Sequence, residues 1–214
     1  MKKIAIIDYG SGNLHSTDKA FEKEVESLGG GEVKLTNKSE DLETATHIVL
    51  PGVGAFADCM SGLSSLPGMI KKLEEQVLKK KKPFLGICVG MQLLAEKGLE
   101  HGEHKGLGWL KGIVEAIKPA DKNLKIPHMG WNELNMKKEH PFFSGIKNGD
   151  HVYFTHSFHM KCENNNDVLA ETEYGCKITA AVAHENLMGT QFHPEKSQEI
   201  GLKLIHNFLQ IGKK

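Results

Sequence analysis

The sequence predicts an α/β fold: a twisted, mostly parallel sheet with helices on both faces and an antiparallel extension. In the first half of the chain, short apolar runs alternate with longer segments of helical periodicity, which is the rhythm of strand-helix-strand units. In the second half, strand-like segments follow one another through tight connections, as in hairpins appended to a parallel core. At 214 residues, with no internal repeat and no long linker, the chain suits one domain over residues 1–214.

The first half supplies four short apolar runs separated by helical patterns. The expected strands are Lys3–Asp8, Val33–Thr36, His47–Leu50 and Phe84–Ile87. The expected helices are Leu14–Leu28, which a run of three glycines ends, a segment around Gly68–Lys80, and Gly90–Leu99. Strands in this rhythm pair in parallel, and helices cover both faces of the sheet that they form.

The second half is expected to form hairpins and to close with an amphipathic helix. The strand-like segments are Gly112–Ile117, His151–Phe154, Val168–Glu173, Thr179–His184 and Leu187–Phe192. The last helix is expected over Ser197–Leu209, and Ser197 is expected to be its N-cap because serine favours that position.

Composition argues against several classes of function. The 27 basic residues, all of them lysine, balance 27 acidic residues. Without net charge or arginine the chain is poorly suited to nucleic acid, and no aromatic residue interrupts the Lys79–Lys82 run. No apolar run approaches the roughly 20 residues of a membrane span, and the first residues are too short an apolar run for a signal peptide, so we expect a cytoplasmic protein.

Four cysteines are scattered along the chain without the spacing of metal ligands. They are Cys59, Cys88, Cys162 and Cys176. In a reducing compartment such cysteines are expected to be free thiols, and at most one of them to carry chemistry.

Three glycine-rich turns should meet at the carboxyl edge of the sheet, where open α/β sheets bind ligands. They occupy residues 9–13, 51–54 and 86–90. The third, Gly86-Ile87-Cys88-Val89-Gly90, has the pattern of a nucleophile elbow with cysteine in place of serine. A helix N-terminus behind Cys88 would favour its thiolate. The same pattern is also compatible with a buried structural cysteine at a tight turn.

Gln191-Phe192-His193-Pro194-Glu195 favours the catalytic interpretation. Cysteine catalysis needs an imidazole to carry protons and commonly a carboxylate to orient it. His193 follows an expected strand and should therefore reach the same edge, with Pro194 placing Glu195 nearby. Spacing alone does not select His193, because the chain has eleven other histidines and a histidine before proline is an ordinary turn residue.

The turn at residues 51–54 supplies candidate donors for an oxyanion. Attack on an amide creates a negative oxygen that preorganised backbone N–H groups stabilise, and Gly52 permits backbone orientations that other residues resist. Val89 N–H, immediately after the cysteine, is the natural second donor. A plain strand-to-helix turn would explain the same residues if the loop stood alone.

Two other patterns are weaker. Gly10-Ser11-Gly12 begins like a dinucleotide-binding fingerprint, but His15 stands at the third glycine position and no acidic residue ends the second strand. Some histidines are close enough in sequence to suggest a metal site, but none has cysteine or carboxylate partners at ligand spacing. These histidines are His151, His156 and His159, and His101 with His104. We therefore expect no metal.

Taken together, the motifs resemble the class I, or triad, glutamine amidotransferases, whose Cys-His-Glu set matches Cys88, His193 and Glu195. The resemblance covers nearly the whole chain and implies a flavodoxin-like fold. Within this class the chain is most similar to the glutaminase subunits of imidazole glycerol phosphate synthases, because other members lack Pro127–Asn132. The segments that carry the resemblance are Asp8–Leu14, Pro51–Phe56, Gly86–Gln92, Pro127–Asn132, Tyr153–Phe158 and Gln191–Ser197.

The resemblance implies that Cys88 hydrolyses glutamine to glutamate and ammonia, with the amides of Val53 and Val89 as the oxyanion hole and without metal or organic cofactor. The residues it implies for substrate binding are Gly52, Gly54, Gln92, His156 and Ser157. The residues it implies for a partner interface are Asn13, Pro127, His128, Met129, Gly130, Trp131 and Asn132.

The partner implied is a (β/α)8-barrel cyclase that forms a heterodimer with the chain and receives the ammonia for histidine biosynthesis. Phe158, Lys196 and Val89 depart from the tyrosine, arginine and leucine usual in the family, and none of them is a triad position. Three alternatives stay open: a paralogous subunit that aminates another substrate, a free-standing γ-glutamyl cysteine hydrolase, and a non-catalytic module on the same fold.

Overall fold

The computed structural model describes residues 1–212, and its centre is an eight-stranded sheet in the order β2-β1-β3-β4-β14-β13-β12-β9. The first five of these strands are parallel neighbours, and the last three continue the sheet in antiparallel pairs. The parallel strands are β1 (Lys2–Ile7), β2 (Gly31–Thr36), β3 (His47–Gly52), β4 (Phe84–Cys88) and β14 (Leu187–Thr190). The antiparallel strands are β13 (Lys177–His184), β12 (Val168–Glu173) and β9 (Asn135–Met136). The predicted α/β fold with an antiparallel extension is confirmed.

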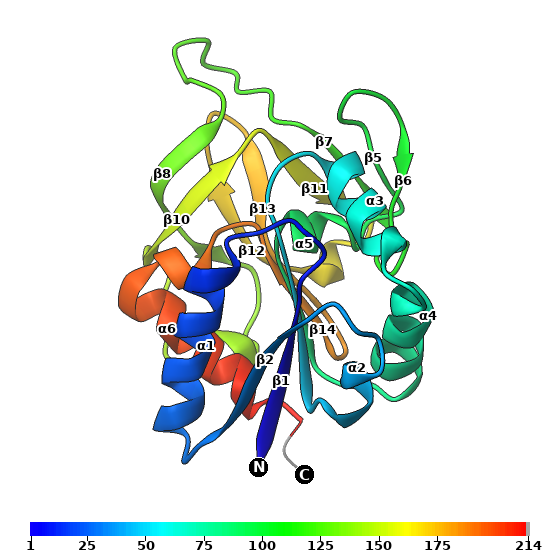
Figure 1. Ribbon diagram of the computed structural model, residues 1–214. Coiled ribbons are helices and arrows are strands. Elements are labelled where there is room, and N and C mark those ends of the chain that lie inside the picture. The colour runs from blue at the N-terminus through cyan, green and yellow to red at the C-terminus, as the bar shows by residue number, and fades with distance from the viewer. Residues whose placement is uncertain (213–214) are drawn as a thin grey trace.

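Helices cover both faces of this sheet (Figure 1). On one face α1 (Leu14–Ser27) packs beside α6 (Gln198–Gln210), where the rings of Phe21 and Phe208 meet edge to face with centroids 6.2 Å apart. The other face carries α2 (Asp41–Thr44), α3 (Phe56–Ser65) and α4 (Met69–Leu73), which a wider π-type turn over Glu74–Lys79 extends. Within residues 1–212 no helix has the length and apolarity to cross a bilayer.

Two small sheets stand at the end of the molecule where the parallel strands finish (Figure 1). One pairs β8 (His128–Glu133) with β10 (His151–His156) in antiparallel register. The other has the order β11-β7-β5-β6, and of these β7 (Gly112–Ala116) was predicted as a strand. Its other members are β5 (Lys97–Gly98), β6 (His104–Lys105) and β11 (Phe158–Cys162).

The helix predicted over Gly90–Leu99 is wrong in length. Helix α5 covers only Val89–Gln92, and the chain then turns into β5. The carbonyl groups that would continue the helix accept hydrogen bonds from the loop at residues 107–110 instead. Gly98 lies so close to Phe56 that a Cβ atom would approach the ring to 2.6 Å, so β5 has no space for a larger residue at this position.

The segment Leu187–Phe192 was predicted to belong to an appended hairpin, and this is only half correct. Its strand β14 pairs with β13 in antiparallel register, but on its other side it pairs with β4 in parallel, Thr190 lying opposite Ile87. It is therefore also the fifth parallel strand, so the chain that leaves it emerges beside Cys88.

Candidate active site

Cys88 occupies the sharp turn between β4 and α5, and the two flanking glycines make this turn possible. A Cβ atom on Gly86 would lie 2.5 Å from the Gly90 carbonyl oxygen, and one on Gly90 would lie 1.8 Å from the Leu50 carbonyl oxygen. Cys88 itself has a φ of +54°, a left-handed conformation that is strained for a residue with a side chain. Because α5 is a single turn, the predicted contribution of a helix dipole to the thiolate has little support.

His193 and Glu195 form a buried pair beside Cys88. The imidazole Nδ1 lies 2.8 Å from the Glu195 carboxylate, and both side chains are 2% exposed. A carboxylate can only accept, so His193 carries a hydrogen on Nδ1 and Glu195 fixes the orientation of the ring. Nε2 is buried and has no hydrogen-bond partner among residues 1–212, which leaves it for a reacting molecule.

The surroundings raise the pKa of His193 to about 10. Burial is the largest single influence and lowers the pKa, but it is exceeded by the charge and proximity of Cys88 together with the hydrogen bond and charge of Glu195. Since Nε2 makes no hydrogen bond of acceptable geometry, the contact with Cys88 is mainly electrostatic. A protonated imidazole is the counter-ion that a thiolate nucleophile requires and the acid that a leaving amine requires.

Ser197 is the N-cap residue of α6, as predicted, but its hydroxyl holds His193 in place and does not bond to the helix. Its hydroxyl donates to the His193 carbonyl oxygen at 2.7 Å and accepts from Tyr153 N–H at 3.0 Å, whereas no side-chain cap forms at the helix. His193 N–H in turn donates to the Tyr153 carbonyl oxygen at 3.0 Å. Hydrogen bonds thus hold the segment that contains His193 against β10.

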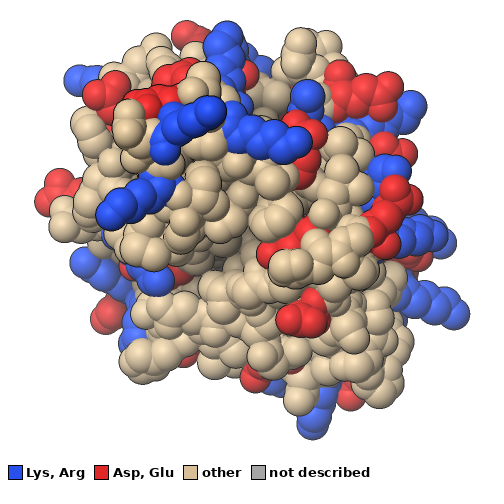
Figure 2. Space-filling view, turned by 90° about the horizontal axis from the view of Figure 1, so that it is seen from above, with Lys and Arg blue, Asp and Glu red and all other residues tan. Residues whose placement is uncertain are grey.

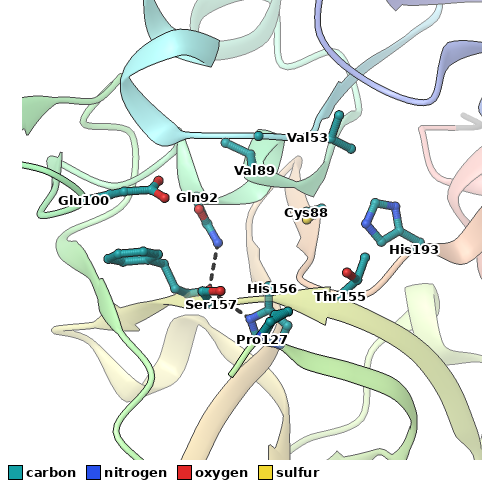
Figure 3. Close-up of a pocket in the computed structure, with 12 residues that line it drawn as sticks. Val53, Cys88, Val89, Gln92, Glu100, Pro127, Thr155, His156, Ser157 and His193 are labelled. Atoms are coloured by element: carbon teal, nitrogen blue, oxygen red, sulfur yellow. Dashed lines mark hydrogen bonds between the residues drawn. The ribbon is translucent and has the colours of Figure 1, made fainter. Parts of the chain in front are cut away.

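A cavity of about 280 Å³ opens over these residues (Figure 3). It brings together the predicted nucleophile, the histidine, both oxyanion residues and all but one of the predicted substrate-binding residues. Its lining consists of Val53, Gly54, Cys88, Val89, Gln92, Glu100, Pro127, Thr155, His156, Ser157, Phe158 and His193. Gly52, the exception, is buried, and a Cβ atom there would lie 2.6 Å from the Tyr9 hydroxyl.

The side chain of Gln92 links the cavity wall to the nucleophile. Its Nε2 donates to the Phe158 carbonyl oxygen at 3.0 Å and to Gln191 Oε1 at 3.0 Å. Gln191 Nε2 lies 3.7 Å from the Cys88 sulfur, at the distance of a weak hydrogen bond to sulfur. Gln191 belongs to the motif around His193, but the motif alone assigns it no role.

Glu100 is the main residue that sequence reasoning missed. It is the one acidic residue in the cavity lining of the described chain, and Figure 3 places it at the opposite end from His193, with Cys88 and Gln92 between. Its carboxylate accepts from Phe56 N–H at 2.8 Å, which fixes it in place. Glu100 belongs to none of the sequence motifs. It directly follows the helix that was predicted over Gly90–Leu99, so the sequence did not indicate that it reaches the cavity.

The loop at residues 51–54 does not present its donor to the cavity in this conformation. Val53 N–H donates to the Ser11 hydroxyl at 3.3 Å, and Ser11 donates back to the Val53 carbonyl oxygen. Val89 N–H opens a helical turn, where backbone amides have no partner within the helix. One of the two predicted oxyanion donors is therefore engaged elsewhere.

The predicted interface residues do not all lie at the surface. Met129 and Trp131 are exposed, by 63% and 47%, whereas His128 on the same strand is 2% exposed. The strand alternates, so His128 and Asn132 face inward and the two large apolar residues face outward. His128, predicted for the partner interface, is consequently an interior residue of the chain by itself.

The remaining histidines form no metal site in the described chain. Within residues 1–212 no group of three or more histidine, cysteine, aspartate or glutamate side chains is arranged to hold a metal ion. His156 is instead hydrogen-bonded to His128, and all four cysteines are free thiols.

The elbow cysteine, the paired histidine and glutamate, and the cavity over them define a hydrolase of the glutamine amidotransferase class. Residues 5–211 match the family model for glutamine amidotransferase class-I, and the chain belongs to that family. Among its relatives are proteins named imidazole glycerol phosphate synthase subunit HisH. That of Brucella abortus (strain 2308) is 54% identical over 97% of this chain and 98% of its own length, and that of Rhodospirillum rubrum is 53% identical with the same coverage.

Solved structures agree on the fold. One described as a glutamine amidotransferase superposes with a TM-score of 0.71 at 20% identity, covering 97% of each chain. A glutamine amidotransferase from Thermotoga maritima has a TM-score of 0.63 at 19% identity, covering 91% of this chain and 76% of its own. At these identities the likeness establishes the fold alone.

Proposed function

We propose that this chain is the glutaminase subunit of an imidazole glycerol phosphate synthase: it hydrolyses glutamine through Cys88, His193 and Glu195 and passes the ammonia to a cyclase subunit. The observation that carries the chemistry is the 2.8 Å pair of His193 and Glu195, buried beside a cysteine on a strained elbow. The relatives named HisH, more than half identical over nearly the full chain, support the particular reaction.

The cavity fits glutamine with its carboxamide at Cys88. The substrate's α-ammonium group would pair with the Glu100 carboxylate at the far end, and its amide would lie between Cys88 and His193 (Figure 3). An ammonium ion needs an acidic partner in a partly closed cavity, and Glu100 is the one acid in the lining that the structure describes.

In the reaction the Cys88 sulfur attacks the carboxamide carbon, and the negative oxygen that forms is held by backbone N–H groups. His193 gives the Nε2 proton to the departing nitrogen, which leaves as ammonia. The γ-glutamyl group stays on the Cys88 sulfur as a thioester. His193 then takes a proton from water as the water attacks the thioester, and glutamate leaves with the thiolate restored. Glu195 keeps the ring oriented through both steps.

A partner is supported by the surface around the cavity mouth. Figure 2 views this edge of the molecule face-on: mostly uncharged side chains surround a central hollow, and most lysines lie toward the periphery. Ile126, Met129 and Trp131 are exposed large apolar residues on the segment next to the cavity-lining Pro127. A partner of (β/α)8-barrel form docked here would cover apolar surface and shield the ammonia from water.

The decisive experiment is to measure glutamate release from glutamine by the isolated chain and by the chain mixed with a cyclase subunit and its nucleotide substrate. We expect slow release alone and much faster release in the complex, together with imidazole glycerol phosphate formed from glutamine. Full-speed hydrolysis without any partner would favour the free-standing γ-glutamyl hydrolase. Rapid hydrolysis with a different acceptor, and none with the cyclase, would favour a paralogous subunit.

A further inference from the structure

Two buried histidines outside the triad are joined in a continuous chain of hydrogen bonds next to the cavity. His156 Nδ1 lies 2.8 Å from the Phe158 carbonyl oxygen, and His156 Nε2 lies 2.9 Å from His128 Nδ1. His128 Nε2 lies 3.1 Å from the side-chain nitrogen of Asn132. His128 and His156 are 2% and 7% exposed, so water does not compete for these contacts.

The hydrogen-bond partners determine which ring nitrogen of His128 and of His156 carries the hydrogen. A carbonyl oxygen can only accept, so His156 carries its hydrogen on Nδ1 and, if neutral, accepts at Nε2. His128 must then donate from Nδ1 and accept at Nε2 from the Asn132 amide. Burial lowers the pKa of His128 to about 4, and burial foremost lowers that of His156 to about 3, so both rings are neutral at physiological pH. Both therefore have the Nδ1–H tautomer.

Asn132, at the outer end of this series of hydrogen bonds, is also held in one orientation. The Asn132 side-chain nitrogen also donates to the Glu173 carbonyl oxygen at 2.9 Å, and its oxygen accepts from Glu133 N–H at 2.8 Å. These contacts allow only one orientation of the amide. Tyr174 stacks on the His128 ring with centroids 4.1 Å apart, which holds the ring plane.

The inner end reaches the glutamine pocket. The Phe158 carbonyl oxygen that accepts from His156 also accepts from Gln92 Nε2 at 3.0 Å, as the dashed lines in Figure 3 mark. Gln92 continues through Gln191 to the Cys88 sulfur. The outer end stands on β8, whose opposite face presents Met129 and Trp131 to solvent.

We propose that His128 and His156, as neutral Nδ1–H tautomers, are positioning residues that couple the exposed face of β8 to the Phe158 carbonyl group and Gln92 in the substrate pocket. This inference rests on the glutaminase function proposed above. A partner that binds Met129 and Trp131 displaces the strand that also carries His128 and Asn132. Because each ring nitrogen of the two buried histidines has one hydrogen-bond partner, the displacement is passed along the hydrogen-bond chain and is not absorbed by water.

The first test observes the tautomers in the isolated chain and needs no activity. With ¹⁵N-labelled histidine, two-bond and one-bond nitrogen-hydrogen correlations at pH 7 should show two neutral rings with the hydrogen on Nδ1, and the variants His128→Asn and His156→Asn should assign them. A hydrogen on Nε2 of either ring, or a charged ring at pH 7, would overturn the proposal. If the tautomers hold but the complex fails to hydrolyse glutamine, only the proposed function is wrong.

The second test separates hydrogen bonding from packing at His128. Asparagine there keeps a donor near the position of Nδ1 but loses the ring, whereas phenylalanine keeps the stack on Tyr174 and Phe154 but has no donor. In the complex, His128→Phe should raise the KM for glutamine about tenfold and reduce stimulation by the partner, while His128→Asn should lose clearly less. The reverse order would show that the ring only packs, and equal, wild-type behaviour of both variants would show no role; either result overturns the proposal.

Discussion

The hydroxyl of Ser11 holds both backbone polar groups of Val53. It accepts from Val53 N–H at 3.3 Å and donates to the Val53 carbonyl oxygen, to which the Cys59 thiol also donates at 3.3 Å. The donor predicted for the oxyanion is thus tied to the turn after β1. Gly54 has a φ of +96°, and no atom lies within 4 Å of the place that a Cβ atom would take there, so the Val53–Gly54 peptide, which carries the Val53 carbonyl group, has room to rotate.

We expect Ser11→Ala to raise glutamine hydrolysis by the isolated chain, because it removes a contact that keeps Val53 N–H out of the cavity. An oxyanion donor is worth about 10²–10³ in turnover, so the gain should approach 10²-fold if the loop is freed completely. Stimulation by the cyclase should shrink by the same factor. Ser27→Ala, at the opposite end of α1, is the control, and an unchanged basal rate in Ser11→Ala would show that the contact does not restrain the loop.

Glu100→Gln should raise the KM for glutamine by about tenfold or more and change kcat little, since it removes the charge proposed to pair with the substrate's ammonium group but keeps an oxygen that can accept from Phe56 N–H. Initial rates with glutamine and with glutaric acid monoamide, which lacks the ammonium group, separate the effects. The variant and the unmodified protein should handle the monoamide alike. Glu103→Gln, an exposed residue paired with Lys97, is the matched control.

Cys88→Ala should abolish glutamine hydrolysis, a loss of at least roughly 10⁴-fold, because among the described residues no other cysteine lines the cavity with His193. Cys162→Ala and Cys176→Ala should retain activity within a few fold of the unmodified protein. Glutamate release in the presence of the cyclase is the measurement. Synthesis by the cyclase from added ammonia should persist in all three variants, and residual glutaminase activity in Cys88→Ala would end the assignment of the nucleophile.

The pKa of His193 should depend on Cys88. Burial lowers it, and Cys88 with Glu195 raises it to about 10, so Cys88→Ala should move the titration of this ring to lower pH. The folded pKa exceeds the ordinary value of 6.5, so this group's contribution to the free energy of unfolding is fully present below about pH 6.5 and is lost as the pH rises through about 10.

Nuclear magnetic resonance titration of His193 and urea unfolding at pH 6.5 and 9.5 measure these two effects. The fall in unfolding free energy between the two pH values should be smaller in Cys88→Ala. An identical titration of His193 in both proteins would show that the cysteine does not influence the ring.

Trp131→Ala should weaken binding of the cyclase and lower glutamine-driven synthesis, because it removes an exposed aromatic side chain beside the cavity mouth. Synthesis from added ammonia should be unaffected, since that reaction needs only the partner. The dissociation constant from titration calorimetry is the measurement. Leu35→Ala, an exposed apolar residue on β2, is the control, and equal affinity of both variants would place the interface elsewhere.

The sequence by itself determined the fold class and indicated which residues belong to the candidate site. Apolar residues repeat along the sequence with the period at which a strand or a helix turns side chains toward the core, so the pattern of apolar residues predicts where strands and helices lie. Gly86 and Gly90 around Cys88 have one structural explanation, since neither position has space for a Cβ atom. The helix α3 was not predicted although Phe56, Cys59 and Leu63 have helical spacing, and Gly62 within it packs against Tyr9.

Only the tertiary structure decided which residues meet. Glu100 reaches the cavity because the chain after α5 turns instead of continuing as a helix, and the cause is hydrogen bonding to a loop some fifteen residues further on. The engagement of Val53 by Ser11 and the pairing of His128 with His156 join segments 42 and 28 residues apart. Local sequence patterns encode periodicity and turns, whereas such contacts depend on strand register and on which strands are neighbours, and these are fixed only when the sheets assemble.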